Sequence, residues 1–124
     1  MSKILLSIKP EFADKIISGE KKFEYRTHIP SRHINSIVIY STSPIGRIIG
    51  EVEVIDVISG SPSSLWERTK TESGISRAKY REYFKGRKRA YAFKLGQVNR
   101  FECDVCLQNY GVTKAPQSFI YLSE

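Results

Sequence analysis

The chain has 124 residues, of which 40% are hydrophobic, 27% are charged and 11% are aromatic, and it carries a formal net charge of +7 at pH 7. This length suits one domain with its own core, so we expect residues 1–124 to form a single domain. The chain has no apolar run long enough to cross a bilayer and no secretory signal at its start, which predicts a cytoplasmic protein without a membrane partner.

The first residues predict a strand followed by a short helix. Residues 3–8 are suited to a strand, and Pro10 is suited to the first turn of a helix over residues 10–18. Apolar side chains recur on one face of this helix, and Gly19 suits the left-handed position in which many helices end. A second strand is therefore expected to begin soon after Gly19.

The second strand, over residues 22–27, should carry its charged side chains on one face. Alternate residues of a strand share a face, so Glu24 and Arg26 should project together while the aromatic residues project to the other side. Lys21 precedes the strand and should lie in the turn. The pattern brings an ammonium, a carboxylate and a guanidinium group close together.

The middle of the chain predicts two further strands. The polar loop after the second strand holds His28 and is followed by His33, and loop histidines of this kind are usually solvated. Residues 34–41 and 47–58 are rich in β-branched side chains, which predicts strands. Gly50 marks a bulge or bend of the kind that a curved sheet needs.

Two helices are expected in the second half of the chain. After a Gly-Ser-Pro-Ser break, residues 64–70 can form a short helix, and its Trp66 is expected to pack in the core or as a lid. A helix over residues 77–85 is better defined, because Ser76 can cap its start and Gly86 can close its end.

The remaining residues predict a strand or strand pair over 89–101, interrupted at Gly96, and a closing strand over 118–122. No internal repeat or low-complexity tail accompanies these elements. Several strands with helices inserted between them, without regular alternation, indicate an α+β fold built on a small mixed-sheet barrel.

One short pattern connects these elements to a known family. Gly19, Lys21, Glu24 and Arg26 form G-x-K-x-x-E-x-R directly after the helix that begins at Pro10. This pattern and several other segments, in their order along the chain, resemble the ASCH family, a branch of the PUA-like β-barrels. The other segments are residues 7–10, 40–44, 50–52, 83–86 and 115–119. The resemblance implies a PUA-like barrel of about five to six mixed strands with about two to three helices. It also implies a cleft beside the first helix that holds Lys21, Glu24 and Arg26.

These three charged groups permit several chemistries. Lys21 can hold a phosphate or polarise a carbonyl, and Glu24 can accept hydrogen bonds from a base edge or activate water. Arg26 can clamp a phosphate or keep Glu24 ionised. The alternative is a set of surface ion pairs worth about 0–1 kcal/mol each. The resemblance places Ser41 near the cleft, so it is a further candidate ligand-binding residue, although turn chemistry before Pro44 also explains its hydroxyl.

Positive charge is concentrated in the second half of the chain. Residues 68–94 hold ten basic and two acidic residues, a net charge of +8, while the rest of the chain sums to −1. Aromatic residues interleave with these cations, which favours a surface for nucleic-acid phosphates; a solvated helix and turn is the alternative. The residues expected on the phosphate backbone are Arg77, Arg81, Lys85, Arg87, Lys88 and Arg89.

The two cysteines do not predict a metal site. Cys103 and Cys106 form a C-x-x-C pair, but no second pair of ligands in the sequence completes a zinc site. No phosphate-cradling glycine-rich loop of a known type occurs either. We therefore expect two reduced thiols, no metal and no cofactor.

The motif and the charge together favour an RNA-binding module that recognises an unpaired or modified nucleotide, with DNA as the other candidate partner. The resemblance also keeps an enzyme open, because relatives resemble amidohydrolases that remove an acyl group from modified cytidine, and others have been proposed as ribonucleases. In a hydrolase, Lys21 and Glu24 would be the catalytic residues. The amidohydrolase branch has a threonine nucleophile at the position that matches Glu24, and a carboxylate there cannot act in the same way as that hydroxyl. A protein-binding adaptor is a third class.

Overall fold

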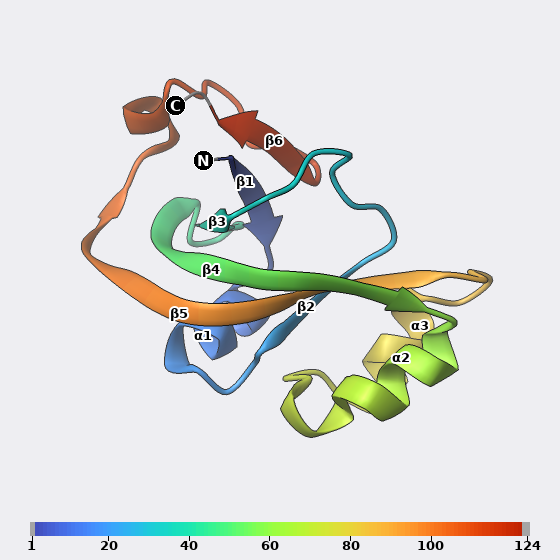
Figure 1. Cartoon of the computed structure of the whole chain (residues 1–124). Helices are drawn as coiled ribbons and strands as arrows, with labels where there is room; N and C mark the ends of the chain where they lie inside the picture. Colours follow the sequence, from blue (N-terminus) through green and yellow to red (C-terminus); the bar gives the residue numbers. More distant parts are fainter. Residues whose placement is uncertain (1, 123–124) are drawn as a thin grey trace.

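The computed structural model describes residues 2–122 (Figure 1). Its strands are β1 (Lys3–Ile8), β2 (Phe23–Arg26), β3 (Ser36–Ser41), β4 (Arg47–Gly60), β5 (Ala90–Val105) and β6 (Phe119–Leu122). Its α-helices are α1 (Pro10–Ser18), α2 (Pro62–Thr69) and α3 (Arg77–Tyr83), and two 3₁₀-helices are η1 (Lys70–Glu72) and η2 (Leu107–Tyr110).

The six strands form one mixed sheet that curls into a half-barrel. Its strand order is β2-β5-β4-β3-β1-β6, with β1 and β3 parallel and all other neighbouring pairs antiparallel. The long strands β4 and β5 bend together (Figure 1), and a bulge at Ile49, beside Gly50, shifts the register of β4 against β3. The predicted α+β class and mixed-sheet barrel are confirmed, with β2 and β6 as the edges of an open barrel.

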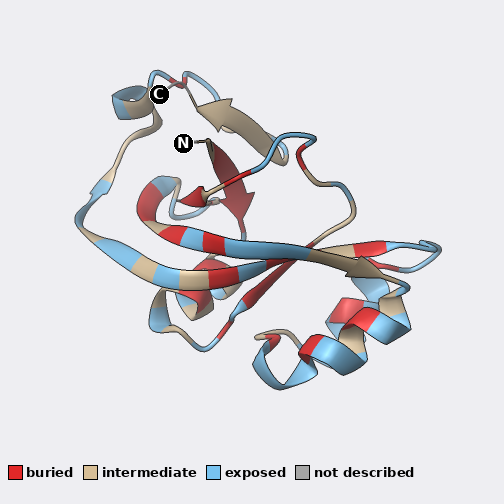
Figure 2. Ribbon diagram, viewed as in Figure 1, coloured by how far each residue is buried: buried red, intermediate tan, exposed pale blue. Residues whose placement is uncertain are grey.

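Two apolar clusters hold the helices against this sheet, and buried residues concentrate along the inner strands (Figure 2). In the main core, α1 packs on β1, β3, β4 and β5. The fully buried residues of this core include Ile4, Leu6, Ile16, Ile37 and Ile39. In the second cluster, Leu65 of α2, Tyr80 of α3 and Phe84, which follows α3, pack against β2 and β5, with the half-buried Trp66 against Tyr80. The second cluster fixes α3 beside β2, because the ring of Tyr25 meets that of Tyr80 with 4.9 Å between their centres.

Most helix ends agree with the start and stop signals in the sequence. Helix α1 spans the predicted residues 10–18, and Gly19 follows it with a φ of +85°. The Ser76 hydroxyl accepts a hydrogen bond of 3.2 Å from the backbone nitrogen of Lys79, so it caps α3 as predicted.

Some predicted element bounds were wrong. Helix α2 begins at Pro62 rather than at residue 64, because Ser61 caps it and proline suits its first turn. Strand β5 is continuous through Gly96 and runs on to Val105, and the irregularity there is a shift of register against β4 rather than an interruption. A glycine in a strand can therefore mark a bulge without ending the strand.

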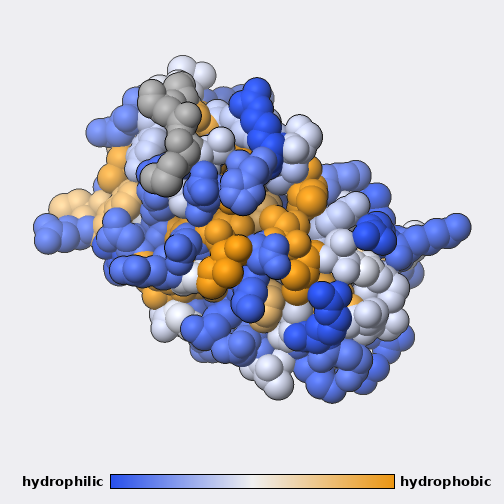
Figure 3. Space-filling view, in the orientation of Figure 1, coloured by the Kyte–Doolittle hydropathy of each residue, from blue (hydrophilic) through white to orange (hydrophobic). Residues whose placement is uncertain are grey.

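The outer surface is mostly polar. Hydrophilic side chains surround a hydrophobic patch near the centre of the face shown in Figure 3. Within residues 2–122, the exposed large hydrophobic side chains are Ile45, Ile55, Val57 and Tyr83. In the same part of the chain, no helix is both long and apolar enough to span a membrane.

Candidate functional site

A cleft of about 560 Å³ opens between the end of β1, the start of α1, strand β2 and helix α3. Lys21, Glu24 and Arg26 all line it. Ser7, Phe12 and Tyr83 contribute from β1, α1 and the end of α3. The three charged residues of the motif therefore share one cavity with residues distant in sequence.

Lys21 is almost completely buried in this cleft, with 3% of its surface exposed. Its Nζ donates a hydrogen bond of 2.6 Å to the backbone carbonyl of Ser73. The same atom lies 5.3 Å from the centre of the Phe12 ring and 4.8 Å from that of the Tyr25 ring, where cation–π attraction stabilises the ammonium. The turn after α1 thus directs an amine into an aromatic setting.

The environment of Lys21 changes its protonation. Burial lowers the pKa of the Lys21 amine from 10.5 to about 8, while the negative charge of Glu24 opposes this shift. A group with a pKa near the ambient pH can both hold and release a proton, which general acid–base chemistry requires. Lys21 can therefore serve as a cation or as a proton carrier.

Gly74 packs directly on the Lys21 side chain. Its φ is +62°, and a Cβ built on it would overlap Lys21 Cβ and lie 2.6 Å from Lys21 Cγ. The backbone nitrogen of Lys22 also donates to the Glu72 carbonyl at 2.9 Å, so this segment runs along the start of β2. The position of Lys21 thus depends on a glycine that follows η1.

Arg26 holds the Glu24 carboxylate in a fixed orientation. Its Nε and Nη2 donate to Glu24 Oε2 at 3.1 and 2.8 Å. Nη2 also donates to the Ser7 carbonyl at 2.9 Å, which ties β2 to the end of β1. Glu24 Oε1 has no hydrogen-bond partner within residues 2–122. Since this oxygen is not fully buried, it can accept a hydrogen bond from a ligand.

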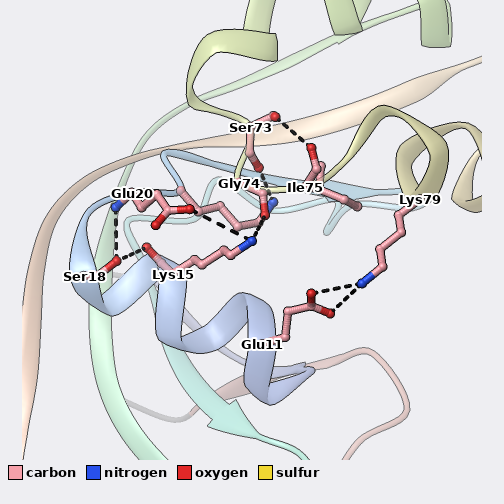
Figure 4. A network of polar contacts seen from close by, with 9 residues as sticks. Glu11, Lys15, Ser18, Glu20, Ser73, Gly74, Ile75 and Lys79 are labelled. Atoms are coloured by element: carbon pink, nitrogen blue, oxygen red, sulfur yellow. Dashed lines mark hydrogen bonds and ion pairs between the residues drawn. The ribbon is translucent and has the colours of Figure 1, made fainter.

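Exposed side chains from α1 and α3 face each other across the cleft. Lys79 reaches from α3 to Glu11 on α1, and its Nζ lies 2.9 Å from Glu11 Oε2 (Figure 4). Tyr83 is 44% exposed, and its ring meets that of Phe84 at 4.8 Å with an interplanar angle of 68°. The cleft therefore combines charged groups with an aromatic ring held against the core.

Not every candidate residue lies in this cleft. Ser41 is buried, pairs in register with Ile8 and does not line the cavity, although its Oγ has no hydrogen-bond partner within residues 2–122. Arg77, Arg81 and Lys85 are exposed on or just after α3 but do not line the cleft either. The other three predicted backbone residues, at positions 87–89, line a second groove beside His28.

The remaining candidates are dispersed. His33 is exposed, and Cys103 and Cys106 are free thiols. Arg47 Nη1 lies 3.2 Å from Cys106 Sγ. In the part of the chain that the structure describes, no group of three or more metal-ligating side chains comes together.

Sequence reasoning missed several residues of the cleft. Ser73 and Gly74 were not predicted to lie near the cleft, yet they contact Lys21. Glu11 and Lys79 were not singled out, and Tyr83 was one of several aromatic residues in the basic region.

Comparisons with known proteins agree with this architecture. The chain matches the ASCH domain family over residues 6–102. It is 38% identical over 92 residues to an ASCH domain-containing ribonuclease of Zymomonas mobilis, covering 73% of this chain and 62% of that protein. More generally, the chain spans 15% to 62% of the length of the curated relatives it matches.

Solved structures give the same result. A crystal structure of an ASCH protein from Zymomonas mobilis matches with a TM-score of 0.91 and 31% identity, covering 98% of this chain and 88% of that one. A mutant of that protein matches with a TM-score of 0.92 and 30% identity, covering 100% of this chain and 92% of that one.

Proposed function

The chain belongs to the ASCH family, and on that premise we propose that it binds RNA and takes one unpaired nucleotide into the cleft. One observation carries the proposal: a buried ammonium and a carboxylate with a free oxygen share one cavity. Its volume of about 560 Å³ suits a small ligand. The amphipathic character of a nucleotide, with its anionic phosphate and flat polar base, matches this lining.

Each group has a defined task in this proposal. The Lys21 ammonium attracts a phosphate, and Glu24 Oε1 accepts a hydrogen bond from a base amino group or a sugar hydroxyl. Arg26 orients Glu24, and the exposed ring of Tyr83 offers a face on which a base can stack. The exposed cations at Arg77, Arg81 and Lys85 add attraction for the rest of the strand.

RNA is preferred over DNA in this proposal for a chemical reason. Only RNA offers a 2′-hydroxyl, and a carboxylate oxygen is a suitable acceptor for it. The similar protein of Zymomonas mobilis is named a ribonuclease, which also supports RNA as the ligand.

The test compares two neighbouring lysines. Lys21→Met removes the ammonium but keeps an apolar stem between Phe12 and Tyr25, whereas Lys22→Met removes an exposed ammonium outside the cleft. Titration of a labelled single-stranded octaribonucleotide should show affinity lower by about tenfold for Lys21→Met. Lys22→Met should stay within about twofold of wild type because an exposed charge contributes little.

Two results would contradict this proposal. The first is wild-type protein that binds no RNA at low salt, or whose affinity does not fall as salt rises, since phosphate contacts release counterions. The second is an equal loss in both lysine variants, which would place the ligand outside the cleft. Circular dichroism and a denaturant titration of each variant show whether it is folded.

A ribonuclease activity is the second candidate, favoured by the lowered pKa of Lys21 beside Glu24. Glu24 Oε1 would remove the proton of a 2′-hydroxyl, and the resulting oxygen would attack the adjacent phosphorus. Lys21 would stabilise the negative charge on phosphate and donate a proton to the departing 5′-oxygen. The P–O5′ bond breaks, which leaves a 2′,3′-cyclic phosphate and a 5′-hydroxyl.

This mechanism requires a 2′-hydroxyl next to the phosphate that is cleaved. An RNA with one 2′-deoxy residue should resist cleavage at that residue alone, and mass spectrometry should find cyclic phosphate at the other cleaved ends. Cleavage at the deoxy position, or loss of cleavage in Lys22→Met but not in Lys21→Met, would refute the mechanism. Release of cytidine from acetylated cytidine would instead support the acyl-removal alternative.

A further inference from the structure

A second groove lies between the loop after β2 and the turn that joins α3 to β5. It has a volume of about 350 Å³ and is lined by residues 27–29, residues 87–89 and Tyr91. It shares no lining residue with the cleft. The groove is therefore a separate concave surface.

The charged side chains that line this groove are all basic. Arg87 and Lys88 are exposed, and their side chains make no hydrogen bond or ion pair within residues 2–122. Arg89 is held in place, because its Nη2 donates to Ser59 Oγ at 2.8 Å and its guanidinium lies 6.0 Å from the centre of the Tyr91 ring. Two unpaired cations and one fixed cation around a concave surface favour an anion of the phosphate type.

The groove begins where the cleft ends. Arg26, which lines the cleft, pairs with Tyr91 in the β2–β5 ladder, and Thr27, which lines the groove, is the next residue along the chain. The three residue steps from Glu24 to Thr27 span about 10 Å in extended backbone. A stacked nucleic-acid strand covers that length with about three nucleotides, at about 3.4 Å each.

We propose that this groove is a phosphate subsite for the same RNA strand, holding a backbone phosphate a few nucleotides away from the nucleotide in the cleft. The inference rests on the proposed function. The proposal gives the two groups of cations different roles. The cations at 87–89 contact one phosphate in the groove, whereas those along α3 attract the RNA only through long-range electrostatics. The RNA strand then runs along β2 from the cleft to the groove.

The experiment uses two lengths of labelled single-stranded RNA. A dinucleotide can fill the cleft but is too short to reach the groove, whereas an octanucleotide can occupy both. The groove variant combines Arg87→Ala with Lys88→Ala, which leaves Arg89 and its contacts intact. The matched control combines Arg100→Ala with Lys114→Ala, since these are also one exposed arginine and one exposed lysine, and they line neither cavity.

The groove variant should bind the octanucleotide about tenfold more weakly than wild type, and the dinucleotide within about twofold. The slope of log affinity against log salt should become shallower by about 0.7 for one lost phosphate contact. The control should keep most of the wild-type affinity and slope for both lengths.

The outcomes distinguish the two proposals. If wild-type protein binds neither RNA, the proposed function fails. If it binds both, but the groove variant matches the control or loses both lengths equally, only the subsite is refuted. Inorganic phosphate is the probe for a free-anion site: binding of phosphate to the groove as tight as binding of the octanucleotide would overturn the strand proposal.

Discussion

Substitution of Gly74 by alanine tests whether the segment after η1 positions the cleft amine. The new Cβ would overlap the Lys21 side chain, and the backbone would have to keep a φ of +62°. The left-handed conformation costs a non-glycine residue about 1–2 kcal/mol, and an overpacked contact adds about 1–3 kcal/mol. We expect Gly74→Ala to lower the free energy of unfolding by about 2–5 kcal/mol when both terms act.

The control is Gly111→Ala, which isolates the backbone term. Gly111 has a φ of +73°, and no atom lies within 4 Å of a Cβ built on it. This variant should lose only about 1–2 kcal/mol, because it has no clash to relieve. Urea titrations of both variants measure this difference.

RNA titrations measure the second consequence. Since Lys21 must move away from the new methyl group, Gly74→Ala should weaken RNA binding about tenfold, through the hydrogen bond to Ser73 and the aromatic contacts. Gly111→Ala should bind as wild type does. Equal stability losses in the two variants, or an unchanged affinity in Gly74→Ala, would refute the positioning role of this glycine.

Three further predictions concern the charges and the aromatic ring. Because the pKa of Lys21 falls from 10.5 in the unfolded chain to about 8 on folding, the unfolded state binds more protons between these values. The stability of wild type relative to Lys21→Met should therefore rise by up to about 1.4 kcal/mol per pH unit from pH 8 to pH 10. RNA affinity should instead fall above pH 8, because Lys21 loses its charge. A stability difference between the two proteins that does not change with pH would contradict the lowered pKa of Lys21. Tyr83→Ala should cost about 1–3 kcal/mol of RNA affinity and Tyr83→Phe almost none, as equilibrium titrations can show; equal losses would exclude stacking. Arg26→Ala should destabilise the fold by about 3 kcal/mol in urea titrations, and adding Glu24→Gln should recover part of this, because a neutral amide needs no counter-ion.

The elements near the start of the chain were predictable because their signals are local. Pro10 and Gly19 bracket α1, and the alternation along β2 places Glu24 beside Arg26, as their ion pair confirms. A residue that sets its own backbone conformation, or contacts a neighbour two positions away, leaves a pattern that can be recognised in the sequence.

Contacts between distant segments were not predictable in this way. Nothing near Lys21 in the sequence indicates that the Ser73 carbonyl accepts a hydrogen bond from its ammonium group or that Gly74 packs on its side chain. Likewise, Ser41 belongs to a segment that the family resemblance placed near the cleft, whereas the register of β3 against β1 buries it outside the cavity. The burial of each residue is set by the packing of whole elements, which a short motif does not encode.

The bonds around Ser7 have a consequence for the order in which the protein matures. Its carbonyl accepts a hydrogen bond from Arg26. Its hydroxyl donates a hydrogen bond of 2.7 Å to the carbonyl of Pro116, which lies 109 positions further along the chain. Ribosomes release a chain from its N-terminus, so α1 and β2 emerge long before their partners. Contacts of such high sequence separation close last, since the intervening loop must first be ordered. A nascent chain that already contains the whole G-x-K-x-x-E-x-R motif therefore has no finished cleft, and it cannot engage its ligand with full affinity until Pro116 has also left the ribosome.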